Sequence, residues 1–385
     1  MQDEYYIKHL DRDMTVKRAM INDFLRLRYR KVVNAAGRLD LEFNADHEFA
    51  SNVEPLDVIE VWRRNVGLGI PWHRDFVALY FDLDEDTDES VITTAVFTCF
   101  GLMDVLRWRQ VGFPAGIDNR SSFSAVSAET VAKTLVDYNL TSLATVGNGR
   151  IRSGDLAVGM GFTVVTAADL GGGNVISQTF YNTNVLRAVT DVIQPIAGGD
   201  FDVTLNGSAQ LEFEFYPGQR GDDKRTGADR VEFSLSKGNM ANPSYRENRS
   251  RAATTAIVAG QGVGDDRYYS IVTGADYAAD FDIEMLVDAR SEWDSSGADD
   301  MGGAALYDRR IDYEFDFDVL QTEATMYSSV PVNVPTRKTY KVGDLVVAFY
   351  KGIAFPRKVR GVDIDVQFRS LGRVHVTIDV ETERV

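Results

Sequence analysis

A two-residue alternation of apolar and polar side chains runs through long stretches of this chain of 385 residues. Successive side chains of a β-strand point to opposite faces, so this period predicts strands with one buried and one wet face. The clearest case is residues 362–380, where two alternating runs flank a glycine-containing turn and predict a hairpin. Residues 201–215 predict a second hairpin, and residues 310–320 predict a further strand. The sequence therefore indicates a mainly β protein with antiparallel sheets.

Two helices are predicted in the middle third of the chain. Residues 127–140 place apolar side chains on one helical face after Ser127, a residue type that caps helix N-termini. Residues 184–193 show the same spacing, and Pro195 with the following glycine pair is expected to stop that helix. A weaker helix is indicated over residues 298–309. The middle of the chain is thus expected to be α+β.

The length favours two or three domains, because single hydrophobic cores rarely grow to this size. Residues 1–118 are predicted to form one β domain, and residues 119–230 form the α+β middle domain. Residues 231–385 are expected to form a second β domain with an inserted segment around residues 288–310.

The net charge of −17 excludes a nucleic-acid binder that works by neutralising phosphates, since that mode requires a basic surface. The single cysteine, Cys99, excludes a disulfide framework and a thiolate zinc site. No apolar leader and no long apolar stretch is present, so we predict neither secretion nor membrane insertion.

A search for catalytic patterns yields no enzyme signature. The four histidines are scattered, and no G-x-S-x-G pentapeptide occurs. Asp316 with Asp318 and Asp363 with Asp365 have a spacing that suits an acid–base pair, but polar outward residues are typical of any half-buried strand. The acidic run 82–89 lacks the glycine and glutamate of a calcium loop, so a solvated hairpin tip is favoured over a weak cation site. We expect no enzyme activity and no cofactor.

Charge is distributed unevenly along the chain. The first 40 residues carry nine basic and six acidic side chains, which leaves −20 for the remainder. Arg26, Arg28 and Arg30 alternate with apolar residues, so a strand here presents a row of guanidinium groups on one face. This row is either a solvated strand face or a contact surface for an acidic partner, such as another copy of the chain.

The order of several segments resembles the tail-tip or baseplate hub proteins of long-tailed, siphophage-like bacteriophages. The segments that carry the resemblance are residues 27–41, 95–109, 127–139, 238–243, 256–267 and 340–350. None of them is a catalytic signature, and the resemblance rests on their order.

The resemblance implies a structural virion protein without enzymatic activity, located at the tail tip or baseplate and assembled in the host cytoplasm. It implies a homotrimer in which each subunit supplies two tail-tube-like antiparallel β-barrels, so that six barrels continue the tail tube as a pseudo-hexameric ring. It further implies three kinds of partner: a hexameric distal tail protein, a tail spike or fibre or tape-measure protein, and phage DNA that passes through during ejection without specific binding.

An acidic channel would repel phosphates and let DNA slide, which gives the acidity of the chain a physical reason. We therefore expect Glu314, Asp316, Asp318, Asp363 and Asp365 to face the lumen. The arginine row of residues 26, 28 and 30 is expected at a subunit or ring interface.

Two other functions stay open at this stage. One is a module that binds host carbohydrate through aromatic residues such as Trp62, Trp72 and Trp293. The other is a tail-borne cell-wall hydrolase that uses an acid–base pair such as those named above.

Overall fold

The fold is given by a computed structural model that describes residues 3–66, 69–87, 93–112, 122–181, 183–278, 280–292, 295–320, 325–326, 339–369 and 373–384. The chain divides into two compact units. Unit 1 comprises residues 1–239 and 319–385, and unit 2 comprises residues 240–318. Unit 2 contains the segment around residues 288–310 that the sequence predicts as an insertion.

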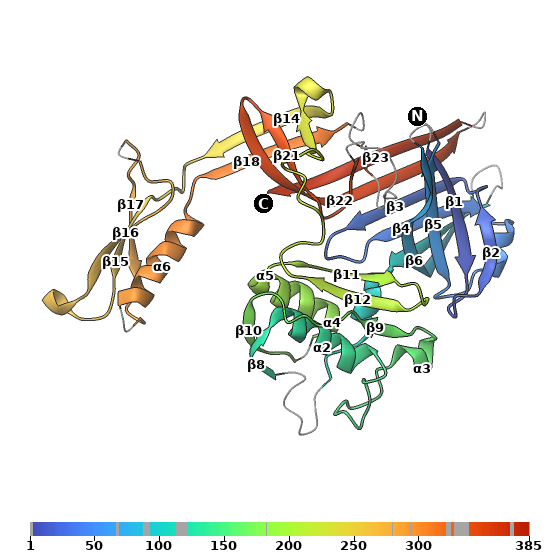
Figure 1. Cartoon of the computed structure of the whole chain (residues 1–385), viewed down its shortest axis with the longest axis horizontal. Coiled ribbons are helices and arrows are strands. Elements are labelled where there is room, and N and C mark those ends of the chain that lie inside the picture. The colour runs from blue at the N-terminus through green and yellow to red at the C-terminus, as the bar shows by residue number, and fades with distance from the viewer. Residues whose placement is uncertain are drawn as a thin grey trace. The chain divides into compact units, whose positions relative to one another are not determined.

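An 11-stranded sheet is the largest element of unit 1 (Figure 1). All neighbouring strands in it run antiparallel except β13 and β21. The strands in sheet order are β13 (Glu232–Ser234), β21 (Leu345–Tyr350), β22 (Ile353–Arg369), β3 (Arg26–Val32), β4 (Arg38–Asn44), β7 (Thr93–Gly101), β6 (Ile70–Thr87), β5 (Val58–Asn65), β1 (Asp3–Leu10) and β2 (Val16–Ile21), with β23 (Arg373–Arg384) paired to β22.

The pairing of β3 with β22 joins the two ends of the chain in this one sheet. Leu27 lies opposite Val366 and Tyr29 opposite Ile364, so the apolar sides of the two strands merge into one buried face. The mainly β class is confirmed. The resemblance implies two barrels, whereas the described strands at the two ends of the chain belong to one large open sheet.

The large sheet is rolled, because strands that are not neighbours in it touch through their inner faces. Tyr29 on β3 stacks on Phe76 of β6, although β4 and β7 lie between these strands in the sheet order. Phe49, on the short helix α1 (Glu48–Asn52), packs against Phe43 of β4 and Phe97 of β7. The inner face of the roll is thus an aromatic core.

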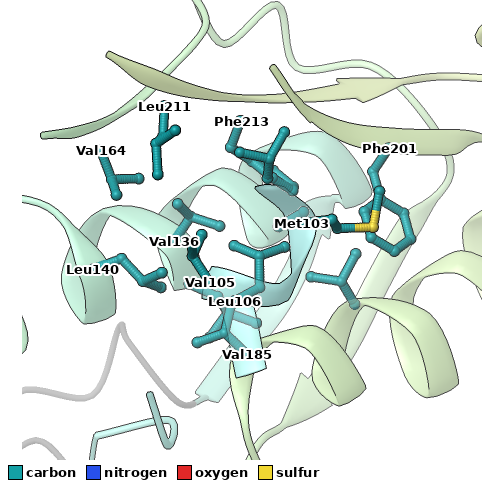
Figure 2. Close-up of a cluster of buried hydrophobic side chains, with 14 of the residues drawn as sticks. Met103, Val105, Leu106, Val136, Leu140, Val164, Val185, Phe201, Leu211 and Phe213 are labelled. Atoms are coloured by element: carbon teal, nitrogen blue, oxygen red, sulfur yellow. The ribbon is translucent and has the colours of Figure 1, made fainter. Parts of the chain in front are cut away.

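The predicted α+β middle is present in unit 1. Ser127 caps α2 (Ala128–Leu140) as expected, since its hydroxyl accepts from the backbone N–H of Thr130. Around α2 lie η1 (Leu102–Trp108), α3 (Leu156–Met160), the sheet of β11 (Asp200–Leu205), β12 (Leu211–Tyr216) and β9 (Val164–Thr166), and the pair of β8 (Ser122–Ser127) and β10 (Val175–Thr179). Figure 2 shows side chains of α2, η1, β9 and β12 meeting in one apolar cluster.

The second predicted helix is longer than expected. It runs through α4 (Val185–Arg187), a π-helical turn η2 (Ala188–Ile193) and α5 (Gln194–Ala197). Pro195 does not stop this helix, because α5 follows directly on the π-helical turn η2 and contains Pro195; of the two expected stop signals, only the glycine pair ends the helix. The helix ends at Gly198, which adopts φ of 68°.

Unit 2 consists of a two-stranded ribbon and a small α/β layer (Figure 1). The ribbon pairs β14 (Met240–Asn248) with β18 (Asp312–Val319). The layer is a sheet of β16 (Tyr269–Thr273), β15 (Thr255–Ala259) and β17 (Glu284–Asp288), covered on one face by α6 (Ser295–Asp308).

The remaining elements are short: η3 (Leu235–Lys237), η4 (Gly264–Asp266), β19 (Thr325–Met326) and β20 (Thr339–Tyr340). None of the helices in the described ranges combines the length and the apolar content that crossing a membrane requires.

Candidate functional site: a charged face of the large sheet

The arginine row and two of the predicted lumen acids lie on the same face of the large sheet. The register of β3 and β22 places Arg28 opposite Asp365 and Arg30 opposite Asp363. Arg26 holds Asp365 with two donors, and its Nε lies 2.9 Å from Oδ1. Asp363 lies 3.4 Å from Arg30 and 3.9 Å from Arg28. The predicted interface residues and lumen residues therefore pair with each other within one chain.

These ion pairs lie at the surface. The arginine side chains are 41–54% exposed, and those of Asp363 and Asp365 are about one fifth exposed. The two-donor hydrogen bond from Arg26 lowers the pKa of Asp365, and that bond raises the pKa of Arg26 in turn. The arginines are thus largely neutralised inside the chain, while half of each side chain remains accessible.

The charges continue over the neighbouring strands. Asp40 and Glu42 of β4 lie opposite Arg28 and Arg26, and Arg38 bonds to Asp40. Beyond β7, the second half of β6 adds three exposed acids at every second position. We call this surface the charged face; it consists of Arg26, Arg28, Arg30, Arg38, Asp40, Glu42, Asp82, Asp84, Asp86, Asp363 and Asp365. With four basic and seven acidic members, it is net acidic.

The other three predicted lumen acids belong to unit 2. Glu314, Asp316 and Asp318 are exposed at every second position of β18, as the alternation predicts. Arg246 of β14 lies 3.6 Å from Glu314, and Asn242 donates to Asp318 at 2.7 Å. Glu314 and Asp318 therefore have a basic and a polar partner across the ribbon.

Replacing Asp365 with asparagine should make the free energy of unfolding depend less on pH in the acidic range. The pKa of Asp365 is lowered by folding, so its contribution is present above the ordinary aspartate pKa of about 4 and is lost as the pH falls through the lowered value. Because the pair is partly exposed, we expect Asp365→Asn to lower the free energy of unfolding by no more than about 1 kcal/mol at pH 7. Near pH 2 we expect no difference from the unchanged chain. Urea unfolding at both pH values measures this, and an equal cost at both would contradict it.

A second polar group, buried inside the rolled sheet, was not predicted from the sequence. Asp75 of β6 accepts from Tyr29 and lies 2.9 Å from the ammonium group of Lys31. Burial lowers the pKa of Lys31 and raises that of Tyr29 well above its usual value. The signal that could have revealed it is the position of Lys31, which continues the inward-facing series of Leu27 and Tyr29.

A cleft of about 400 Å³ adjoins this buried group within unit 1. Its polar lining includes Arg74, Asp202 and Arg220. Arg220 pairs with Asp202, and Arg74 lies 3.0 Å from Glu60. The charges of these two pairs are mutually compensated, so the pairs stabilise the contact of the sheet with the α+β part.

Among the residues that the structure describes, the histidines and the acidic run do not combine into a metal centre. His9 bonds to Asp57, and His47 caps α1. Within the described part of the chain no group of three potential ligands comes together. The run predicted as a hairpin tip continues β6 as far as Thr87, and residues 88–89 lie outside the described ranges.

The aromatic residues considered for carbohydrate binding are partly covered. The ring of Trp62 stacks on the ring of Tyr6, and the ring of Trp72 contacts Tyr6 edge-on. The guanidinium group of Arg64 lies over the ring of Trp72. Trp293 lies outside the described ranges. Because these rings already have partners, they offer little open aromatic surface to a sugar.

Comparison with solved structures finds similar chains at low sequence identity. A chain of the Francisella PdpA–VgrG complex has a TM-score of 0.51 at 9% identity, over 100% of this chain and 53% of that chain. The tail protein from Neisseria meningitidis MC58 has a TM-score of 0.48 at 11% identity, over 98% and 97% of the two chains. Prophage tail protein gp18 from Listeria monocytogenes EGD-e has a TM-score of 0.46 at 12% identity, over 97% and 94%. The first of these shows a shared fold.

No curated protein matches the sequence. A family described as Siphovirus ReqiPepy6 Gp37-like protein matches residues 7–378. The match spans nearly the whole chain and both units, and it confirms the resemblance to siphophage proteins that the order of the sequence segments indicates. The chain therefore belongs to the Siphovirus ReqiPepy6 Gp37-like protein family.

Proposed function

We propose that the chain is a structural protein of the bacteriophage tail, a subunit of the baseplate or tail-tip hub. The observation that carries this proposal is the family match over residues 7–378, together with a fold shared with a chain of the PdpA–VgrG complex. The mainly β architecture supports this proposal, because an extended β-sheet can form part of the wall of a tube. The protein is proposed to act in the virion tail, after assembly in the host cytoplasm, without enzymatic activity.

The proposed assembly is a homotrimer. Each subunit contributes two tube-like portions, so that the ring has pseudo-hexameric symmetry and continues the tail tube. The rolled half of the large sheet, with its aromatic core around Phe49, is a suitable unit for one portion. The strands around β22 are suitable for the other. A hexameric distal tail protein above the ring and a spike, fibre or tape-measure protein below it complete the proposed partners.

The charged face is proposed to line the channel through which DNA leaves. Its net acidic character repels phosphates, and the pairing of its arginines with Asp363 and Asp365 leaves few cations free to hold them. The arginines are about half exposed and have five donors each, so they keep hydrogen-bonding capacity for a neighbouring subunit at the ends of the strands. The charged face is thus proposed both to line the channel and to contact a neighbouring subunit.

Labelling of intact virions tests this function. Gold-labelled antibody against the chain should bind at the end of the tail that is distant from the capsid, in every virion. Antibody against the major tail-tube protein is the matched control and should not mark the tip alone. Labelling on the capsid or along the whole tail, or a chain missing from purified virions, would overturn the proposal.

A further inference from the structure

Three arginines of unit 1 lie close together at the loop that joins α2 to α3 (Figure 1). Arg109 directly follows η1, and Arg150 and Arg152 belong to the loop itself. The Nε atom of Arg109 donates to the backbone oxygen of Gly154 at 2.8 Å, and a Cβ added at Gly154 would lie 2.1 Å from Nη1 of Arg150. Nη1 of Arg150 also donates to the backbone oxygen of Arg152 at 3.3 Å. The guanidinium groups of Arg109 and Arg150 therefore converge on Gly154.

The loop is built around the guanidinium group of Arg150, a residue that is only 8% exposed. Its Nε donates to Oδ1 of Asn139 at 3.0 Å, and its Nη2 donates to the backbone oxygen of Gln110 at 2.7 Å. A Cβ at Gly112 would lie 2.9 Å from Nε of Arg150, so glycine leaves the room that this side chain needs. The fold thus fixes the positive charge of Arg150 at one place.

None of these three arginines forms an ion pair with a residue that the structure describes. The side chain of Arg152 is exposed and makes no hydrogen bond to those residues either. The acid that attracts Arg109 is Asp155, but the Asp155 carboxylate accepts from the backbone N–H of Ala157 at 2.9 Å. The described part of the cluster therefore contains no carboxylate at ion-pair distance from its guanidinium groups.

The three positive charges act on one another. Burial lowers the pKa of Arg109 and of Arg150, and the charges of the neighbouring arginines lower both further. Guanidinium groups stay charged at neutral pH all the same, so positive charge is concentrated here. On the charged face, by contrast, Arg26 and Arg30 lie beside aspartates. An anion bound between the guanidinium groups of the cluster would relieve their repulsion.

Charge and geometry indicate which anion suits the cluster. The three arginines and the single acid Asp155 leave a local net charge of +2, in a chain whose net charge is −17. A phosphate group with one ester bond carries about −1.5 to −2 at pH 7 and has three terminal oxygens. A carboxylate carries one charge and has two oxygens. Because the planar donors of arginine match phosphate oxygens, three arginines suit a phosphate group better than a carboxylate.

We propose that Arg109, Arg150 and Arg152 bind a doubly charged phosphate group, which is either free phosphate or the terminal phosphate of a larger molecule. Arg152 and Arg109 donate to its oxygens, since Arg152 has all five donors available and Arg109 uses two of its five. Arg150 holds the loop in place and adds its charge from within. This site goes beyond the proposed function and does not depend on whether the chain forms a ring.

Calorimetric titration of the full chain with inorganic phosphate at pH 7 tests this site, with the ionic strength held constant by sodium chloride. The unchanged chain should show saturable binding of one phosphate. Arg152→Gln should weaken this binding about ten-fold or more, and Arg152→Glu should abolish it. Arg152→Lys should retain part of it, because the charge is kept. Absence of saturable binding by the unchanged chain, or equal binding by the Arg152→Glu variant, overturns the proposal.

The matched control is Arg251→Gln, because Arg251 is an exposed arginine that belongs to unit 2. This variant should bind phosphate as the unchanged chain does. Both Arg152 and Arg251 are exposed, so circular dichroism should show the same fold in every variant. A loss of phosphate binding by Arg251→Gln equal to that of Arg152→Gln would overturn the proposal, since the effect would then follow from total charge.

Two further probes define the ligand. Dimethyl phosphate has one charge and two free oxygens, so it should bind about ten-fold more weakly than inorganic phosphate. Equal binding of the two would overturn the assignment to a doubly charged phosphate group. Glycerol phosphate keeps the doubly charged group at the end of a larger molecule. Tighter binding of glycerol phosphate than of inorganic phosphate supports a larger ligand, and weaker binding supports free phosphate.

Discussion

Replacing Asp75 with alanine should destabilise unit 1 by about 3–5 kcal/mol, because it leaves a buried ammonium group without its counter-charge. The Asp75 side chain is completely buried and holds Lys31, whose side chain is only 12% exposed. Tyr29 donates to the other carboxylate oxygen, and the buried guanidinium of Arg63 adds positive charge nearby. Without Asp75, Lys31 would lose its counter-charge, while Arg63 would keep Asp3 at 2.6 Å.

The free energy of unfolding of unit 1, followed by fluorescence in guanidinium chloride, measures this effect. Asp84→Ala is the matched control, because Asp84 lies on the same strand but is exposed, and it should change stability by less than about 0.5 kcal/mol. Replacing the pair together, with Asp75→Leu and Lys31→Met, should restore most of the loss, because a well-packed apolar pair replaces a buried ionic one. Equal effects of Asp75→Ala and Asp84→Ala would contradict this account of the buried group.

The second large effect is expected at Phe213, where Phe213→Ala should cost about 3–5 kcal/mol. Phe213 is fully buried on β12, beside Phe201 of β11 and above α2 (Figure 2). Its removal leaves a cavity that α2 cannot close, because α2 is held at Ser127 and packed along its whole apolar face.

Thermal or denaturant unfolding of the purified variant measures this cost. The neighbouring residue Glu212 faces the other side of β12, so Glu212→Ala is the matched control and should change stability by less than about 0.5 kcal/mol. A cost for Phe213→Ala of less than about 1 kcal/mol would show that the cluster in Figure 2 is not a packed core.

Local sequence signals predicted much of the secondary structure. The alternation around Arg28, around Glu314 and around Ile364 marks β3, β18 and β22, and Ser127 marks the start of α2. These features depend on side-chain period and capping, both of which act over a few residues. They can therefore be read without knowing the fold.

Long-range pairing could not be predicted in the same way. Arg26 and Asp365 are 339 residues apart, and nothing in either strand specifies its partner. The sequence therefore placed them on two different surfaces, whereas the structure brings them to one. The single open sheet has the same cause, because β3 selects β22 through matching apolar faces and not through a local turn.

Burial of charged residues was equally hard to predict. Nothing local to Lys31 specifies its partner, because Asp75 lies 44 residues away on β6. On β16 both sides of the strand carry apolar residues, Val272 on one and Ile271 on the other. The sequence could not tell which side α6 would cover.

The mass of the purified chain, measured by native mass spectrometry and followed by electron microscopy of the particles, tests the central claim most directly. The account predicts a species of about three times 42.8 kDa, with threefold symmetry and a central hole. A particle that remains a single 42.8 kDa chain at every concentration, also in the presence of its tail partners, would contradict it.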